Sequence, residues 1–258
     1  MTEWKIIGAK SQGTSHLYTN TPCQDYYKTG CIQSSLYCFV SDGAGSAQYG
    51  MEGAEISCET ALEHIQTLLI NPDYEINEAD LINVAETIHD KLNQKAIELK
   101  CQARDLACTF LGLVITNNYA GYIQIGDGSI VVKYSDIYSN YQVLFWPQAG
   151  EYANMTFFIT EESYLANINC KCLDDLPTEI AVFTDGIQRL ALLFDSKEVH
   201  IPFFEPMFNI LNKTEDALEL NTLNKKLETF LESNAINQRT DDDKTLVLIS
   251  RKNNELEQ

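Results

Sequence analysis

Three strand-like segments of this chain run directly into an Asp-Gly pair, and this repetition constrains the fold more than any other feature. The aspartates are Asp42, Asp127 and Asp185, and each follows a run that is mostly apolar. Aspartate is depleted from strands, so its recurrence at strand ends requires a shared reason. A carboxylate in that place, followed by a glycine that lets the backbone approach closely, suits a hard metal ion. We therefore expect the three strand ends to converge on one site.

The size and charge of the chain exclude several classes of protein. Its 258 residues, 45% of them hydrophobic, suffice for one large domain or two small ones with a substantial core. Neither a membrane-spanning apolar stretch nor a secretory signal is evident, so we expect a cytoplasmic protein that does not enter a membrane. The formal net charge of -19 disfavours nucleic-acid binding, because an acidic surface repels phosphate backbones.

The eight cysteines are scattered irregularly, and none forms a Cys-x-x-Cys pair. Reduced, mostly buried thiols are therefore expected. Cys170 and Cys172 stand too close together for an ordinary zinc knuckle, so a zinc site is disfavoured.

Hydrophobic periodicity predicts blocks of strands and blocks of helices rather than strict alternation, which favours an α+β layered domain. Helices are expected over residues 48–70, 78–102, 186–194 and 216–231, and strands over 4–9, 36–41, 180–184 and 244–250. Short runs between 107 and 145 predict an antiparallel meander with a hairpin turn at Asn117-Asn118. Residues 11–25 are expected to form a loop, 156–160 a further strand, and 150–160 either a flap near the site or an ordinary connection.

Two further acidic sites lie at strand boundaries. Asp25 follows the first loop, and the triplet Asp241-Asp242-Asp243 directly precedes the last strand. Taken singly, an Asp-Gly pair is a common turn and an acidic triplet a common loop. Together with the three Asp-Gly pairs they favour one explanation over five separate ones.

In this order the motifs resemble those of the metal-dependent Ser/Thr protein phosphatases of type 2C, the PPM family. The matching motifs are Gln24-Asp25, Ser41-Asp42-Gly43-Ala44-Gly45-Ser46, Gly126-Asp127-Gly128, Thr184-Asp185-Gly186 and Asp242-Asp243-Lys244-Thr245. The likeness covers nearly the whole chain and is closest to a compact bacterial branch of the family. Gly13-Thr14-Ser15-His16 and the segments 149–156 and 183–190 also resemble that branch.

The resemblance implies one catalytic domain over residues 1–258. The implied fold is a four-layer α-β-β-α sandwich of two antiparallel sheets flanked by helix pairs. The implied enzyme hydrolyses phosphoserine and phosphothreonine with a water activated by two Mn²⁺ or Mg²⁺ ions, and bacterial members hold a weaker third ion. A phosphorylated protein substrate, a cognate Ser/Thr kinase and a role in bacterial signalling are implied as well.

Metal-binding roles also follow from the resemblance. Asp42 would bridge the two ions, and the backbone carbonyl of Gly43 would bind one of them. Asp25 would hold that ion directly or through water. Asp185 would bind the other ion, and Asp127 would join Asp185 around the third.

The acidic triplet offers two alignments. The family pattern selects Asp242 as the partner of Asp185 on the second ion, with Asp243 as its support. Asp241 is the alternative ligand.

Two departures from the family pattern affect the expected chemistry. Asn20 occupies the position of a phosphate-binding Arg, and His16, Arg189 or Arg239 are the candidates to replace it. Ala44 occupies the position of a proposed general-acid His in eukaryotic members. Protonation of the leaving group would then depend on metal-bound water or on His16, which we count with Asp42 and Asp185 as a candidate catalytic residue.

The same departures leave two other functions open. A pseudophosphatase could bind a phosphoprotein or a partner without turnover, although the full set of aspartates argues against it, because carboxylates crowd unfavourably without a metal. A hydrolase of small phosphorylated molecules is the second alternative.

Overall fold

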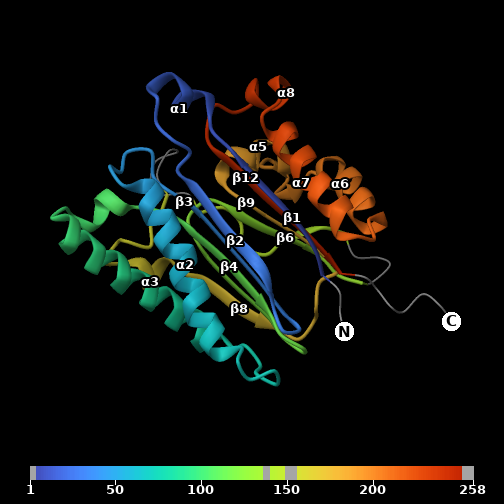
Figure 1. The fold of residues 1–258 in the computed structure, drawn as a ribbon, viewed down its shortest axis with the longest axis horizontal. Coiled ribbons are helices and arrows are strands. Elements are labelled where there is room, and N and C mark those ends of the chain that lie inside the picture. Colours follow the sequence, from blue (N-terminus) through green and yellow to red (C-terminus); the bar gives the residue numbers. More distant parts are fainter. Residues whose placement is uncertain (1–3, 136–139, 149–155, 252–258) are drawn as a thin grey trace. The chain divides into compact units, whose positions relative to one another are not determined.

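The computed structural model describes residues 4–135, 140–148 and 156–251. The chain divides into two compact units that interleave along the sequence. The first unit comprises Met1–Thr21, Ser129–Trp146 and Leu176–Gln258, and the second comprises Pro22–Gly128 and Pro147–Asp175. Each unit is built on one five-stranded antiparallel sheet with helices packed against it (Figure 1).

The sheet of the second unit has the strand order β2-β3-β4-β5-β8. The strands are β2 (Asp25–Ile32), β3 (Ser35–Asp42), β4 (Phe110–Ile115), β5 (Ala120–Ile125) and β8 (Asn169–Leu173). Helix α2 (Gly50–Leu68) packs on β2 and β3, and α3 (Glu78–Leu99) packs on α2 and β8. The short helices η1 (Ala103–Leu106) and α4 (Tyr164–Asn167) complete this unit.

Local sequence explains where the long helices begin and end. Apolar residues at helical spacing, such as Ala54, Cys58 and Ile65, form the buried face of α2. Helix α3 begins with a capping box in which Asn77 and Asp80 accept each other's backbone N–H groups. It ends at residue 99 rather than the expected 102, because Lys100 takes the left-handed conformation that closes many helices.

The sheet of the first unit has the strand order β1-β12-β9-β6-β7. The strands are β1 (Trp4–Ser11), β6 (Ser129–Lys133), β7 (Gln142–Val143), β9 (Glu179–Phe183) and β12 (Lys244–Arg251). Helix α6 (Ile201–Lys213) packs on β12 and α7 (Ala217–Leu231) on β1, which makes the second helix pair. The shorter elements are α1 (Thr14–Thr19), α5 (Asp185–Ala191), β10 (Leu192–Leu193), β11 (Glu198–Val199) and α8 (Asn234–Asn237).

The expected α+β fold with two antiparallel sheets and helix pairs is confirmed. The hairpin at Asn117-Asn118 joins β4 to β5, with the Thr116 backbone N donating to the Tyr119 carbonyl at 2.8 Å. Several expectations were wrong. The expected loop over residues 11–25 contains α1, and the helix expected over 186–194 ends at Ala191. The strands between 107 and 145 form no single meander, since β6 pairs with β9 in the other sheet. Residues 156–160 form irregular structure that ends in a turn, and no strand.

Other elements also escaped the sequence patterns. Helix α6 contains Pro202 and Pro206, which read as helix breakers, but Pro202 lies in the first turn, where its missing N–H costs nothing. Strands β2 and β8 are mostly half-buried and lack the alternation that marks a strand with one apolar face.

All eight cysteines are free, but the expectation that most are buried is wrong. Only Cys38, Cys58 and Cys108 are buried, and Cys31 is exposed on the edge strand β2. Residues 149–155, part of the expected flap, lie outside the described residues. No helix within the described ranges is long and apolar enough to cross a membrane.

Candidate active site

Two of the expected ligands lie side by side at the open end of the β2–β3 hairpin. Asp25 is the first residue of β2, Asp42 is the last residue of β3, and the strand register pairs them directly. Asp25 is fully buried and Asp42 is half-buried. Directly opposed like charges destabilise a strand pair, so this arrangement favours a place where a cation binds.

Close packing fixes the backbone at Asp42-Gly43. The N–H of Asp42 donates to Thr109 Oγ1 at 3.1 Å, and the N–H of Gly43 donates to the Gln24 carbonyl at 3.2 Å. A Cβ on Gly43 would lie 2.3 Å from backbone atoms of Gly50, the first residue of α2. Only glycine allows this approach, so Gly43 and its carbonyl have a fixed position.

Asp127 follows a bend at the end of β5 that requires glycine. The residue before it, Gly126, has a φ of 106°, a conformation that favours glycine, and its N–H donates to Gln148 Oε1 at 2.7 Å. A Cβ on Gly126 would lie 2.5 Å from the Thr109 side chain. Thr109 therefore supports the turn before Asp127 and also binds the backbone of Asp42. The sequence patterns had not singled it out.

In the first unit, Asp185 begins α5 directly after β9. The preceding Thr184 is joined to Thr245 by two hydrogen bonds, one of them from the Thr245 N–H to Thr184 Oγ1 at 3.0 Å. A Cβ on Gly186 would lie 2.0 Å from the Asp243 carbonyl oxygen. The glycine after Asp185 therefore permits close packing against the acidic triplet.

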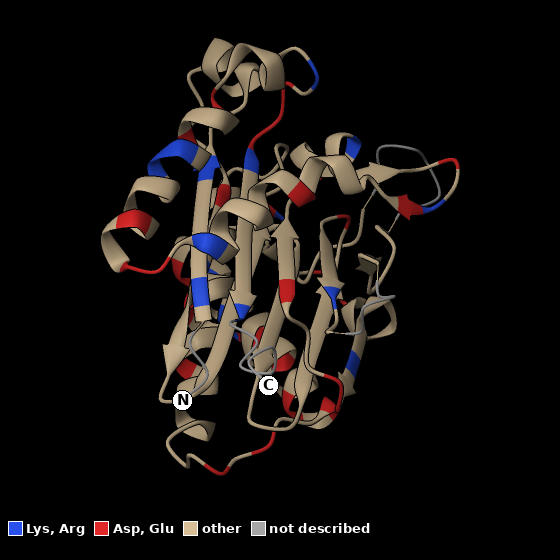
Figure 2. Ribbon diagram, turned by 90° about the vertical axis from the view of Figure 1, so that its right-hand side faces the viewer, with Lys and Arg blue, Asp and Glu red and all other residues tan. Residues whose placement is uncertain are grey.

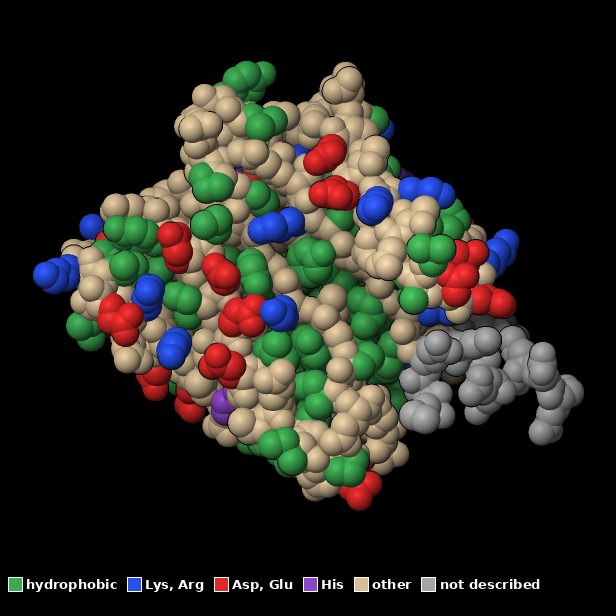
Figure 3. Space-filling view, in the orientation of Figure 1, with side chains coloured by type: hydrophobic (Ala, Val, Ile, Leu, Met, Phe, Trp, Pro, Cys, Tyr) green, Lys and Arg blue, Asp and Glu red, His purple; other side chains and the backbone are tan. Residues whose placement is uncertain are grey.

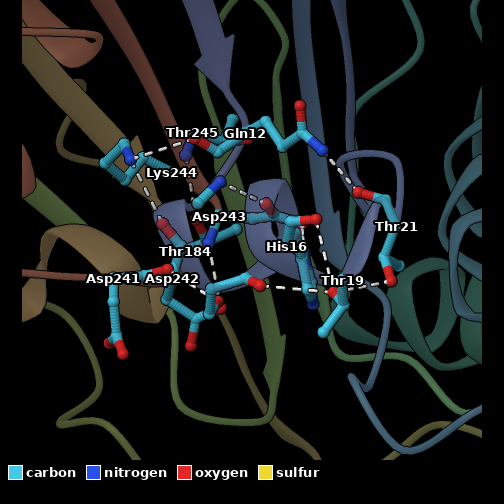
Figure 4. A network of polar contacts seen from close by, with 12 residues as sticks. Gln12, His16, Thr19, Thr21, Thr184, Asp241, Asp242, Asp243, Lys244 and Thr245 are labelled. Atoms are coloured by element: carbon cyan, nitrogen blue, oxygen red, sulfur yellow. Dashed lines mark hydrogen bonds and ion pairs between the residues drawn. The ribbon is translucent and has the colours of Figure 1, made fainter.

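Asp243 is the centre of a polar network that joins the triplet to α1 (Figure 4). Its carboxylate is 2% exposed, accepts the Gly13 N–H at 2.6 Å and lies 2.9 Å from His16 Nδ1. An ionised carboxylate only accepts, so Nδ1 carries the hydrogen and Nε2 is left for another partner. The side chain of His16 is 15% exposed.

The segment Gly13-Thr14-Ser15-His16 packs against the backbone of the triplet. Both the N–H and the hydroxyl of Ser15 donate to the Asp241 carbonyl, at 2.9 and 2.7 Å. A Cβ on Gly13 would lie 2.4 Å from the same oxygen. Two motifs at opposite ends of the sequence thus form one local structure.

Asp241 and Asp242, unlike the buried Asp243, are exposed. Partial desolvation and the carboxylates of Asp243 and Asp241 raise the pKa of the Asp242 carboxyl. A bound cation would oppose this and favour the ionised form. The fully buried Lys244 holds the triplet from behind, with its Nζ donating to the Asp242 carbonyl at 3.2 Å and to Asn237 Oδ1 at 3.0 Å.

The candidates for phosphate binding occupy different places. Arg189 is exposed on α5, and Arg239 is exposed after α8, where it lines an apolar pocket beside α6 and α7. Neither side chain makes a hydrogen bond or ion pair with another described residue. Asn20 caps the C-terminus of α1 with a φ of 56°. Asparagine tolerates this left-handed conformation better than arginine does, which gives a local reason for its presence.

The donor chemistry fits a hard divalent ion. The expected ligands offer only carboxylate and carbonyl oxygens, which Mg²⁺ and Mn²⁺ prefer. Within the described parts of the chain, no group of three or more His, Cys, Asp or Glu residues is placed to hold a metal ion. Neither the Asp25–Asp42 pair nor the triplet supplies a complete ligand set alone.

Comparisons with known proteins agree with the fold. The family model described as Protein phosphatase 2C matches residues 12–232. Serine/threonine-protein phosphatase 3 of Escherichia coli (strain K12) is 39% identical over 251 residues, which cover 95% of this chain and 97% of that protein.

Solved structures share the fold at low sequence identity. A serine/threonine phosphatase of S. agalactiae has a TM-score of 0.59 at 14% identity, over 96% of this chain and 99% of that chain. PppA, a regulatory component of the T6SS in Pseudomonas aeruginosa, has a TM-score of 0.61 at 13% identity, over 96% and 98%. RsbX in complex with magnesium has a TM-score of 0.54 at 14% identity, over 98% and 99%.

The fold, the family match and the relative together define a metal-dependent protein serine/threonine phosphatase. The chain belongs to the protein phosphatase 2C family.

Proposed function

We propose that this chain removes phosphate from phosphoserine and phosphothreonine with two Mn²⁺ or Mg²⁺ ions. The residues proposed to hold them are Asp25, Asp42, the carbonyl of Gly43, Asp185 and Asp242, and Asp127 would hold a weaker third ion with Asp185. The observation that carries this proposal is the register pairing of Asp25 with Asp42. When bound, such ions supply an activated water and positive charge toward the phosphoryl oxygens.

We propose that His16 transfers a proton to the leaving group. As the P–O bond to the serine oxygen breaks, that oxygen takes the Nε2 proton of the imidazolium form of His16, which leaves the neutral ring with its remaining hydrogen on Nδ1. Asp243 would act as a positioning residue, because it holds Nδ1 at 2.9 Å and so directs Nε2 away from the buried carboxylate. This arrangement would replace the histidine that family members carry where this chain has Ala44.

For the substrate phosphate we propose Arg189, which is exposed on the helix that begins with Asp185. Its planar guanidinium could bind two phosphate oxygens at once. His16 remains the second candidate. Arg239, the third, lines an apolar pocket, which favours another role for it.

The proposed substrates are phosphoproteins made by a cognate serine/threonine kinase. The structural relatives include a T6SS regulator, which supports a signalling role for this chain. A cytoplasmic location is supported by the eight free cysteines, since thiols persist in reducing compartments.

The test compares wild type with Asp42→Ala and Asp185→Asn on a phosphoserine peptide and on p-nitrophenyl phosphate. We expect activity with Mn²⁺ that a chelator abolishes, and a loss on the order of 100-fold in each variant, because each removes a proposed ligand. Asp195→Asn, an exposed carboxylate outside the proposed site, is the matched control.

Full activity of Asp42→Ala would overturn the ligand assignment. Calorimetry with Mn²⁺ on the same proteins tests binding separately from turnover. Two ions bound by wild type, and weaker binding by both site variants but not by Asp195→Asn, would support the assignment.

A further inference from the structure

An apolar pocket lies in the first unit, outside the proposed active site. It has a volume of about 470 Å³ and is lined by residues of α6 and α7. These two helices pack on β12 and β1 (Figure 1). Buried residues form its floor, namely Ile7, Leu190, Leu227 and Leu248. This volume is in the range of pockets that bind small molecules.

The walls of the pocket are apolar and adaptable. Phe203, Met207 and Phe230 line them, and Phe230 is 37% exposed. Pro206 also lines the pocket from within α6, where it removes one backbone hydrogen bond of the helix. Side chains such as methionine adjust their shape readily, which suits a flexible hydrocarbon chain.

The apolar surface continues beyond this pocket. A second hollow of about 520 Å³ shares Ile210, Leu223 and Lys226 with the first. Its other lining residues are Lys213, Thr214, Leu218, Glu219 and Thr222. Leu218 is 76% exposed and Ile210 is 56% exposed. We call the two hollows together the α6–α7 groove. It provides a path for an extended ligand rather than a compact one.

The charged residues that line the first hollow are basic, whereas the chain as a whole is acidic. The protein has 37 acidic and 18 basic residues, and acidic segments recur over its helices and loops (Figure 2). Acidic and basic side chains are interspersed on the face in Figure 3. By contrast, the described residues that line the first hollow include Lys226, Arg239 and His200 but no Asp or Glu.

The two cations are available to a ligand. Lys226 and Arg239 are exposed, and neither side chain makes a hydrogen bond or ion pair with another described residue. His200 Nδ1 lies 2.8 Å from the Leu190 carbonyl and must donate to it. An apolar groove with unpaired cations at its rim is complementary to a hydrocarbon chain that ends in an anion.

We propose that the α6–α7 groove binds a single-chain carboxylate amphiphile, a long-chain fatty acid, with its chain along the groove and its carboxylate at Arg239 and Lys226. Guanidinium groups bind carboxylates in a bidentate manner, which favours Arg239 as the main contact. The binding does not depend on the proposed phosphatase mechanism.

The test is calorimetric titration of the full, metal-free chain with carboxylates of increasing chain length below their micelle-forming concentrations. We expect one molecule bound per chain and affinity that rises with length, because each added methylene is buried. The alkyl alcohol and the alkyl trimethylammonium of equal length are the matched ligands, and we expect both to bind about tenfold more weakly.

Variants locate the site. Lys226→Gln with Arg239→Gln should weaken carboxylate binding about tenfold and leave alcohol binding unchanged, whereas Lys225→Gln, on α7 outside the pocket lining, should change neither. Met207→Trp fills the hollow and should weaken both ligands at least tenfold. If Met207→Trp does not fold, the variants at the exposed Lys226, Arg239 and Lys225 still test the proposal.

Several outcomes would overturn the proposal. One is no saturable binding, and another is binding that these variants leave unchanged. Equal affinity for the trimethylammonium compound would remove the charge argument. A dimer in light scattering that Met207→Trp converts to a monomer would show that a second copy of the chain, and not a fatty acid, occupies the groove.

Discussion

The carboxylate of Asp243 lies 2.9 Å from Nδ1 of His16, although the two residues are 227 positions apart in the sequence. The same carboxylate accepts the backbone N–H of Gly13 and is almost completely buried. The acidic triplet is therefore no solvated loop. One of its members holds α1 in place. Asp241 and Asp242 are exposed, and the Asp242 carboxylate accepts the backbone N–H of Asp243 at 2.9 Å.

The first prediction concerns Asp243→Asn. An amide can donate to Nδ1 as well as accept from it, so the variant no longer selects one tautomer of His16. We expect kcat on a phosphoserine peptide to fall by about 100-fold, the usual scale of general-acid catalysis. Hydrolysis of p-nitrophenyl phosphate should fall far less, because its leaving group needs little protonation.

Two controls separate this role from a loss of structure. His16→Ala should show the same substrate dependence, and the double variant should be no worse than His16→Ala alone. Nitrogen NMR of the metal-free protein should report hydrogen on Nδ1 of His16 in wild type and a mixture in Asp243→Asn. Equal losses on both substrates would contradict the positioning role.

The second prediction concerns Gly43→Ala. The added Cβ would lie 2.3 Å from the backbone of Gly50, so either the hairpin end or the start of α2 must move. We expect the free energy of unfolding to fall by about 1–3 kcal/mol, measured by urea denaturation. The exposed Gly45 is close by, and Gly45→Ala should change stability far less. Equal stability of the two variants would show that the approach to α2 is not tight.

The third prediction concerns Asn20, which has a φ of 56° at the C-terminus of α1. Asn20→Arg restores the residue type of the family pattern but places a long side chain in the left-handed region, so we expect a loss of about 1 kcal/mol in unfolding free energy. Asn20→Gly should be neutral or stabilising, because glycine adopts this conformation freely. A neutral Asn20→Arg would mean that α1 can end without the left-handed residue.

The sequence predicted most of the fold because its long helices and central strands have clear periodicity. Helix α2 and strand β12 are of this kind, with continuous buried faces. Strand β2 was missed because its side chains are half-buried and show no alternation. Strand β6 was expected in one meander with β4 and β5 but pairs with β9. Periodicity predicts that a segment is a strand but does not identify the strand with which it pairs.

The motif order proposes the residues of the candidate site, whereas it says little about their contacts. The motif order selected Asp42, Asp185 and the triplet without any structure. It gave no reason for Thr109, which holds the turns at Asp42 and Gly126, because a lone threonine before a strand carries no signal. The role of Lys244 as a buried support was hidden for the same reason, since a lysine is ordinarily expected at the surface.

The last prediction concerns the thiols, which differ in reactivity although all eight are free. Burial raises the pKa of Cys38 to about 12 and that of Cys108 to about 11. The thiolate is the nucleophile, so at pH 8 both groups stay protonated as well as inaccessible. We expect iodoacetamide to modify the exposed Cys31 in the folded protein and to leave Cys38 and Cys108 unmodified, as measured by peptide mass spectrometry.

In urea all eight should react, and Cys31→Ser should remove one modification from the folded protein without exposing the other two. Modification of Cys108 at a rate comparable to that of Cys31 would mean that the contact between Gly43 and Cys108 opens readily, and the backbone beside Asp42 would then be less rigid than its packing indicates.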